Sequence, residues 1–432
     1  MLKITCEGVY YKNGGFVPAK DGPAAGLPAP EKAREGTMAH AILKAHNTGD
    51  NMEELAIRFD AMASHDITYV GIIQTARASG MQAFPLPYVL TNCHNSLCAV
   101  GGTINEDDHV FGLSAAKKYG GEFVPAHQSV IHSYMRERYA APGRMILGSD
   151  SHTRYGAYGT MAIGEGGPEL ARQLLSKTYN IPYPKVIAIY LTGTPIPGVG
   201  PQDVALELIR STFKDGVVKN AVMEFFGPGV ANLSMDYRSG IDVMTTETTC
   251  LSSIWPADHT LKAHLAVLGR GEAFKPQAPA DGAYYDGLIE VELDKIRPMI
   301  ALPFHPSNAY TIQEFQENLD ELLHQVDEDT VRQLKLKNRP ASLREKIVDG
   351  KFRVDQGVIA GCSGGTYQNI VRAAQILDGR AIGSGEFWLS VYPTSQPVNL
   401  ELTRRGYIAS LMAAGASIRS CFCGPCFGAG DV

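Results

Sequence analysis

Short apolar runs alternate along the chain with longer stretches whose apolar residues have helical spacing. A short apolar run between turn-forming residues is typical of a buried strand, whereas apolar residues at every third or fourth position favour a helix. Strands are therefore predicted at 144–148, 185–193 and 356–361, and helices at 51–65 and 112–121. Strands and helices that alternate in this way predict layered α/β domains.

Two changes in composition divide the chain. The segment LTGTPIPGVGPQD (191–203) is rich in Pro and Gly, so it is predicted to close one unit and open the next. From Thr311 to Gly350 the chain is charged and helical, as expected for a solvated connector that leads into a third unit. A length of 432 residues also requires more than one core. The predicted domains are 1–185, 186–305 and 306–432.

Composition and charge exclude several classes of protein. Apolar residues make up 44% of the chain and charged residues 19%, an ordinary balance for a globular protein. The net charge of −6, without a basic stripe, argues against nucleic acid as a partner. No apolar run is long enough to span a membrane, and the N-terminus lacks a secretory signal. Eight cysteines without such a signal predict a reducing, cytoplasmic location, where thiols serve metals or chemistry.

Reactive side chains follow several of the strand-like runs. In open α/β sheets, ligands bind in the crevice beyond the carboxyl ends of the strands. A site is therefore expected where these runs end. The side chains delivered there are Cys93 and His94 after PYVLTN, then Asp150, Ser151 and His152 after RMILGS, and Cys362 after QGVIAG.

Three more cysteines, Cys421, Cys423 and Cys426, lie close to the last residue. The pair in CGPC is either a redox dithiol or part of a metal site. A tetrahedral zinc site would need further ligands at matching spacing, and the sequence has no second C-x-x-C and no H-x-x-x-H. With Cys362 from its glycine-rich loop, three thiolates are able to hold an iron–sulfur cube and leave one iron open. An open iron is a Lewis acid that binds hydroxyl and carboxylate groups.

The motifs GSDSHT, GCSGGTYQNI and CGPCFG, in this order, resemble the aconitase family of [4Fe–4S] hydro-lyases. The resemblance covers nearly the whole chain, as far as the third of the family's four domains, and implies a three-domain α/β/α architecture. It also implies that Cys362, Cys423 and Cys426 are the cluster ligands. Cys421 is then a bystander, a small buried residue.

The same resemblance implies a set of acid–base groups, and general chemistry supports it. An imidazole beside a carboxylate is oriented and kept basic, so two couples are expected, Asp150 with His132 and Glu247 with His152. His94 corresponds to the family's histidine that protonates the departing hydroxyl. Ser151 and Arg154, within and directly after DSHT, are expected to contact a substrate carboxylate.

Three positions depart from the family pattern. Cys93 replaces an aspartate, and a thiol has an ordinary pKa of about 8.5 against about 4 for a carboxyl group. His65 replaces a substrate-contacting glutamine, and Val243 replaces an asparagine that would hold a cluster-bound water. These departures imply a divergent hydratase-like member whose substrate, a small hydroxy-carboxylic acid, is other than citrate.

Two further interpretations stay open beside the hydro-lyase. One is a non-catalytic iron–sulfur or iron-sensing protein that has lost acid–base competence, and the other is a dithiol oxidoreductase that uses CGPC. The chain also ends soon after Cys426, where the family continues into a substrate-contacting segment and a C-terminal swivel domain. We therefore expect a truncated chain, inactive alone, with an open crevice and a labile or absent cluster.

Overall fold

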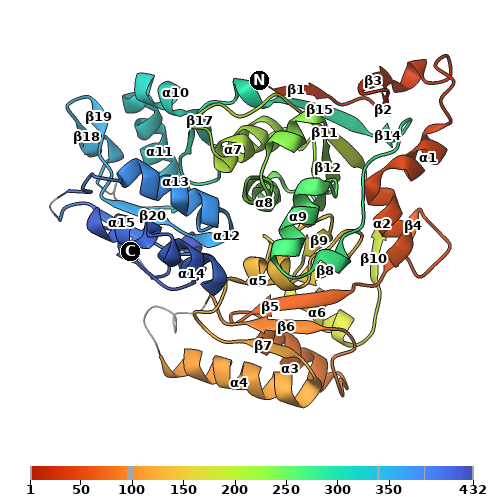
Figure 1. Ribbon diagram of the computed structural model, residues 1–432, viewed down its shortest axis with the longest axis horizontal. Helices are drawn as coiled ribbons and strands as arrows, with labels where there is room; N and C mark the ends of the chain where they lie inside the picture. Colours follow the sequence, from red (N-terminus) through yellow and green to blue (C-terminus); the bar gives the residue numbers. More distant parts are fainter. Residues whose placement is uncertain (1, 95–101, 338–340, 384, 431–432) are drawn as a thin grey trace.

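Three sheets, parallel except for the edge strand β1, organise the molecule, each with helices packed against it (Figure 1). The computed structural model describes residues 2–94, 102–337, 341–383 and 385–430. The fold is mixed α/β, which confirms the predicted class. In the described part of the chain, no helix is both long and apolar enough to cross a bilayer.

The first sheet has the order β7-β6-β5-β8-β9, and all its strands are parallel. Alternate residues of a strand point to opposite faces. Ile146 accordingly packs with residues of α5, while Met145 and Leu147 pack with residues of α3 and α6. The strands are β5 (Ala61–His65), β6 (Tyr88–Thr91), β7 (Glu122–Val124), β8 (Met145–Gly148) and β9 (Met161–Gly164), and the helices are α3 (Tyr69–Ala78), α4 (Thr103–Tyr119), α5 (Ile131–Arg138) and α6 (Gly167–Leu174).

The second sheet has the order β1-β15-β11-β12-β13, with only β1 antiparallel to its neighbour. Trp255, directly after β13, stacks on Phe225 of β12 with ring centroids 4.3 Å apart. Arg238 is fully buried and pairs at 2.7 Å with Asp258, which also caps α9. The strands are β1 (Leu2–Thr5), β11 (Val186–Thr192), β12 (Val222–Phe226), β13 (Ser252–Ile254) and β15 (Gly287–Glu292), and the helices are α7 (Pro201–Thr212), α8 (Met235–Met244) and α9 (His259–Val267).

The N-terminal segment belongs with the second sheet by its strand pairing. Besides β1, the hairpin of β2 (Val9–Lys12) and β3 (Gly15–Pro18) pairs with β14 (Tyr284–Tyr285). Two short helices follow, α1 (Pro30–Ala33) and α2 (Met38–His46). Strand pairing thus crosses the predicted boundary at 185, and the domain limits stay predictions.

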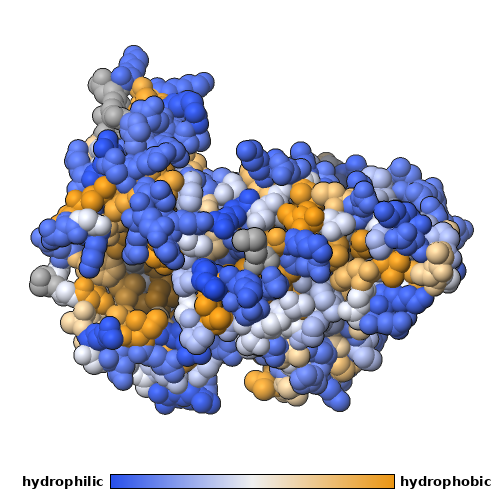
Figure 2. Space-filling view, turned by 90° about the horizontal axis from the view of Figure 1, so that it is seen from above, coloured by the Kyte–Doolittle hydropathy of each residue, from blue (hydrophilic) through white to orange (hydrophobic). Residues whose placement is uncertain are grey.

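The third sheet, β20-β21-β22, has its own hydrophobic core. The strands are β20 (Gln356–Ile359), β21 (Trp388–Val391) and β22 (Ser417–Ile418), and the helices are α12 (Gly361–Gly364), α13 (Tyr367–Leu377), α14 (Gln396–Arg404) and α15 (Tyr407–Ala413). Before them, the predicted helical connector forms α10 (Ile312–Glu317) and α11 (Leu319–Gln333), followed by the hairpin of β18 (Ile347–Val348) and β19 (Lys351–Phe352). The space-filling view is hydrophilic over most of its area and is hollowed on its left side, where hydrophobic residues gather (Figure 2).

The helix predicted at 51–65 is wrong. This stretch forms β4 (Glu54–Ile57), which pairs with β10 (Tyr179–Pro182), and then β5. Leu55, Phe59 and Met62 have helical spacing, but each is buried because it lies on a strand or beside one. A short apolar run fits a helix and a buried strand equally well, and tertiary packing decided between them. The helix predicted at 112–121 is confirmed as part of α4, which ends at Gly120 with φ 87°.

Candidate active site

The ends of three parallel strands bring the predicted acid–base residues together. His65 is the last residue of β5, His94 follows β6, and Asp150 follows β8. Because the carboxyl ends of parallel strands meet at one edge of the sheet, these side chains converge. His132 joins them from the first turn of α5.

Asp150 is the centre of this group, and we call Asp150 with its four histidines the histidine cluster. The Asp150 side chain is only 11% exposed. Its Oδ1 also accepts a hydrogen bond of 2.7 Å from the backbone nitrogen of His152. The nearest ring nitrogens lie 3.0 Å (His94 Nε2), 3.2 Å (His132 Nε2), 3.5 Å (His152 Nδ1) and 3.6 Å (His65 Nε2) from its oxygens.

Charge is distributed unevenly over the histidine cluster. Burial alone would raise the pKa of Asp150, but the charge and the hydrogen bonds of the surrounding histidines hold it far below its usual range. Burial opposes protonation of His94 and His152 too, yet neighbouring negative groups raise their pKa values to about 10 and about 9. Burial lowers the pKa of His132 to about 4 and that of His65 to about 3. At neutral pH the cluster therefore holds two imidazolium and two neutral imidazole rings.

The hydrogen bonds of His132 fix its tautomer. An ionised carboxylate only accepts, so Nε2 of His132 carries the hydrogen that faces Asp150. Nδ1 is then the acceptor for the Tyr155 hydroxyl at 3.2 Å. His65 stacks on His94 with ring centroids 3.9 Å apart. The rings are thus held in place by partners on several sides.

The second expected couple is also in contact. Glu247, in the 3₁₀ turn after α8, places Oε1 at 3.1 Å from Nε2 of His152. The hydrogen bond from His152 lowers the pKa of Glu247. His305 approaches the other oxygen of Glu247, at 3.8 Å, and stacks on Phe213. Sequence reasoning missed His305, because a lone histidine in a loop gives no spacing signal.

The three predicted cluster cysteines come from two loops of the third unit. Cys362 lies in α12, Cys423 caps the 3₁₀ turn Gly424–Phe427, and Cys426 lies within that turn. Gly361 has φ +77°, and a Cβ there would lie 2.6 Å from Cys426 Sγ. The glycine therefore leaves room for Cys426 beside the Cys362 loop. Three thiols from two segments, near enough for the charges of Cys362 and Cys426 to raise the pKa of Cys423, fit the donor set of an iron–sulfur cluster.

The positions that depart from the family pattern lie beside this donor set or within the core. Cys93 is fully buried, accepts a hydrogen bond from the backbone nitrogen of Ile131 at 3.3 Å, and lies 3.3 Å from Nδ1 of His94. Burial raises its pKa, but the hydrogen bond with Cys423 and the charge of His94 prevail and bring it to about 6. Val243 is buried in α8 and forms part of the hydrophobic core.

Arg154, Ser151 and Cys421 lie outside these contacts. The Arg154 guanidinium donates to the carbonyl oxygens of Thr153 and Cys250, and the residue is 4% exposed. Its expected contact with a substrate therefore stays a prediction. Ser151 is exposed, with Oγ 3.4 Å from Nδ1 of His152. Cys421 is fully buried and pairs with His127 through a backbone bridge.

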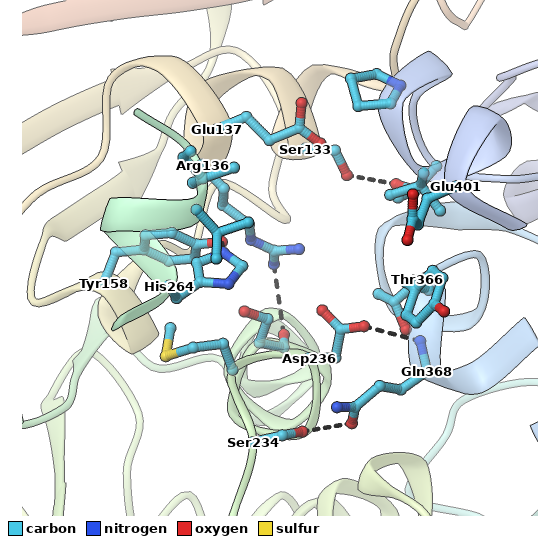
Figure 3. Close-up of a pocket in the computed structure, with 18 of the residues that line it drawn as sticks. Ser133, Arg136, Glu137, Tyr158, Ser234, Asp236, His264, Thr366, Gln368 and Glu401 are labelled. Atoms are coloured by element: carbon cyan, nitrogen blue, oxygen red, sulfur yellow. Dashed lines mark hydrogen bonds between the residues drawn. The ribbon is translucent and has the colours of Figure 1, made fainter. Parts of the chain in front are cut away.

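A cavity of about 560 Å³ lies between α5, α8, α9, α13 and α14 (Figure 3). The Arg136 guanidinium is at its inner wall and donates to the carbonyl oxygens of Cys362 (3.0 Å) and Ser239 (3.4 Å). Arg136 thus joins this inter-helix cavity to the loop of a predicted cluster ligand. It follows His132 by four residues on α5, a spacing that sequence reasoning did not use.

Comparison with known proteins identifies the family of the chain. Residues 40–432 match the model of the aconitase family (aconitate hydratase). The chain is 30% identical over 395 residues to the mitochondrial aconitate hydratase of Schizosaccharomyces pombe, covering 87% of this chain and 46% of that protein. The corresponding enzyme of Candida albicans is 27% identical, with 91% of this chain and 51% of that protein covered. The chain spans about half the length of these relatives. By the extent of the family match, the chain belongs to the aconitase family.

Proposed function

We propose that this chain provides the cluster-binding part of an iron–sulfur hydro-lyase that acts on a small hydroxy-carboxylic acid other than citrate. The observation that carries the proposal is the histidine cluster around Asp150, within reach of the loops that bear Cys362, Cys423 and Cys426. Membership of the family supports a hydratase at the level of reaction class. Together they favour an enzyme over a purely structural protein.

Cys362, Cys423 and Cys426 would hold the [4Fe–4S] cluster. When bound through three thiolates, such a cluster supplies one iron able to act as a Lewis acid toward a hydroxyl group. Burial raises the pKa of the Cys362 thiol to about 12, although the charge of Arg136 opposes this. This thiol therefore gives up its proton only when a cation replaces it, so cluster binding should release protons.

The proton chemistry is assigned to the residues around Asp150. His94 carries a proton at neutral pH and is proposed to donate it to a departing hydroxyl. Neutral His132 is oriented by Asp150, and His152 by Glu247. The imidazolium rings of His94 and His152 also supply positive charge for a substrate carboxylate, beside Ser151 and His65. The base that removes a proton from the substrate is proposed to come from a C-terminal swivel domain that closes over the crevice. The same domain is proposed to supply further contacts to the substrate carboxylates.

The proposed substrate follows from the positions that differ from the family pattern. His65 presents an imidazole where an amide is expected, and Val243 is an apolar side chain inside the core. A site built around different hydrogen-bonding groups discriminates strongly against the usual ligand, because buried polar groups are left unpaired. Citrate and isocitrate are therefore proposed to be poor substrates.

The test is anaerobic reconstitution with iron and sulfide, followed by assay of a panel of hydroxy acids and unsaturated acids. Both the 432-residue chain and the full product of its gene should be assayed. We expect a near-full complement of iron and sulfide per chain, a three-iron signal in electron paramagnetic resonance after exposure to air, and turnover of a non-citrate acid by the full product. Efficient conversion of citrate would overturn the proposed substrate. Equal loss of the cluster in Cys421→Ser and in Cys362→Ser would overturn the proposed set of cluster ligands.

A non-catalytic iron–sulfur protein remains the second candidate, favoured by the thiol at Cys93 beside Cys423. It predicts a full cluster without turnover of any acid in the panel. A dithiol oxidoreductase is not favoured, because the hydrogen bond with Cys93 and burial raise the pKa of Cys423 well above its usual value, and attack on a disulfide needs a thiolate. A reducing, cytoplasmic location is proposed. Cell fractionation tests it against the mitochondrion, where the Schizosaccharomyces pombe and Candida albicans relatives are placed by name.

A further inference from the structure

Three ligating atoms meet at the edge of the histidine cluster in a grouping that the proposed hydro-lyase assignment does not explain. Atoms of Cys93, His94 and Cys423 that are able to bind a metal all lie within 4.8 Å of one another. Cys93 Sγ is 3.3 Å from Nδ1 of His94. The three residues are 0%, 8% and 5% exposed, so each is a buried donor and none is an accidental surface group.

The spacing of these atoms fits one ion. Around a tetrahedral zinc-type cation, with bonds of about 2.3 Å to sulfur and about 2.0 Å to nitrogen, neighbouring ligand atoms are roughly 3.5–3.8 Å apart. In an iron–sulfur cube each protein thiolate binds a different iron, which holds the sulfur atoms farther apart. Cys93 and Cys423 are therefore closer together than two ligands of one cube, and they suit a single shared ion.

The surroundings already orient each ligand. His94 directs Nε2 to Asp150 Oδ2 at 3.0 Å, which leaves Nδ1 facing Cys93. A carboxylate behind a histidine is the usual way to fix a metal-binding ring. The backbone nitrogen of Ile131 donates to Cys93 Sγ, and that of Cys423 donates to the carbonyl oxygen of Cys93 at 2.7 Å. The two cysteine-bearing segments are thus held against each other by the backbone.

We propose that Cys93, His94 and Cys423 form a site for a single thiophilic divalent cation, of which Zn²⁺ is the type, with water as the fourth ligand. Binding replaces the thiol proton of Cys423, and any proton still present on Cys93 or on His94 Nδ1, by the cation. The site does not depend on the proposed function. If Cys423 also binds a cluster, the ion and the cluster exclude each other. Which of them is bound then depends on whether the divalent cation or iron with sulfide is supplied.

The test uses the reduced, metal-free 432-residue chain without iron or sulfide, titrated anaerobically with Co²⁺ as a spectroscopic substitute for Zn²⁺. We expect one equivalent to bind, with tetrahedral ligand-field bands, a thiolate charge-transfer band for two sulfurs, and displacement by one equivalent of Zn²⁺. Cys93→Ser and Cys423→Ser should each remove about half of the charge-transfer intensity. Asp150→Asn should weaken binding by about 10–100-fold and leave the intensity unchanged, because Asp150 orients His94 and the change removes no thiolate.

Cys421→Ser and Cys362→Ser are the matched controls, and both should bind Co²⁺ like the unchanged chain. Loss of intensity in Cys362→Ser equal to that in Cys93→Ser would overturn the proposal, since the ion would then sit among the predicted cluster thiols. X-ray absorption of the zinc-loaded chain needs no variant to fold, and it should give two sulfurs and two nitrogen or oxygen atoms. Three or four sulfur ligands in the X-ray absorption spectrum would also overturn the proposal. So would binding of more than one equivalent of Co²⁺ that Cys93→Ser does not change.

Discussion

The histidine cluster and the inter-helix cavity of Figure 3 both contain histidine and carboxylate side chains, but the contacts between these side chains differ. In the histidine cluster, four imidazoles share one carboxylate, Asp150. In the cavity each carboxylate has a separate partner, which is Arg405 for Glu401 and a neutral group for Asp236 and Glu137. Asp236 accepts from the backbone nitrogen of Gln368, and Glu137 accepts from the Ser395 hydroxyl.

This difference decides which region is the better candidate for chemistry. Coupled groups shift one another's pKa values, and such shifts mark sites able to move protons. The volume of the cavity is sufficient to bind a small ligand, but volume alone does not indicate catalysis. Arg136 connects the two regions, because it lines the cavity and donates to Cys362.

The largest effect is expected from Asp150→Asn. The amide keeps the shape of the carboxylate but removes the charge that raises the pKa values of His94 and His152. Turnover by the reconstituted full product should fall by about 10²–10⁴-fold. In nuclear magnetic resonance of the metal-free chain, the pKa of His152 should fall from about 9 towards its ordinary value. Asp236→Asn, in the cavity, is the control and should leave both measurements unchanged.

Arg136→Met tests the connection between the two regions. The substitution keeps much of the aliphatic packing but leaves the carbonyl oxygens of Cys362 and Ser239 without their donor. Each unsatisfied buried group costs about 1–3 kcal/mol, so the free energy of unfolding in urea should fall by about 3 kcal/mol. The lifetime of the bound cluster in air should decrease as well. Arg405→Met, on the outer rim of the same cavity, should leave the unfolding midpoint where it is, and an equal loss there would contradict the special role of Arg136.

Sequence and structure agree best where the family resemblance assigns the residues. The pairs Asp150–His132 and Glu247–His152 were expected from the motifs, and the structure has both in contact. His305 and Arg136 were missed because they reach Glu247 and Cys362 only through tertiary packing. The helix predicted at 51–65 failed for a related reason, since nothing in the spacing of Leu55 and Phe59 reveals a neighbouring strand.

The pH dependence of stability should have opposite signs in the two regions. Hydrogen bonds with Asp150 and Glu247 overcome burial and raise the pKa of His152 to about 9, so its contribution is fully present below its ordinary pKa of about 6.5 and is lost as pH rises through 9. Burial lowers the pKa of His264, in the cavity wall, so its contribution is present above about 6.5 and is lost as pH falls.

His152→Gln and His264→Gln measure these two contributions. The difference in unfolding free energy between His152→Gln and the unchanged chain should shrink from pH 6 to pH 10. The corresponding difference for His264→Gln, which loses its contact of 2.9 Å with the Tyr158 hydroxyl, should shrink as the pH falls from 8 to 5. Urea titrations at several pH values give both. Slopes of the same sign would remove the electrostatic distinction between the regions.

The smallest effect is expected from Ala263→Leu, which narrows the cavity without touching the histidine cluster. Ala263 is an exposed residue of α9 that lines the cavity, and leucine suits a helix nearly as well as alanine. The free energy of unfolding should change by less than about 0.5 kcal/mol, as for other exposed positions. Turnover by the reconstituted full product should be unchanged, because no proton-carrying group is displaced. A fall in turnover like that of Asp150→Asn would mean that the cavity takes part in the reaction through Arg136 and Cys362, and the two regions would then have to be treated as one site.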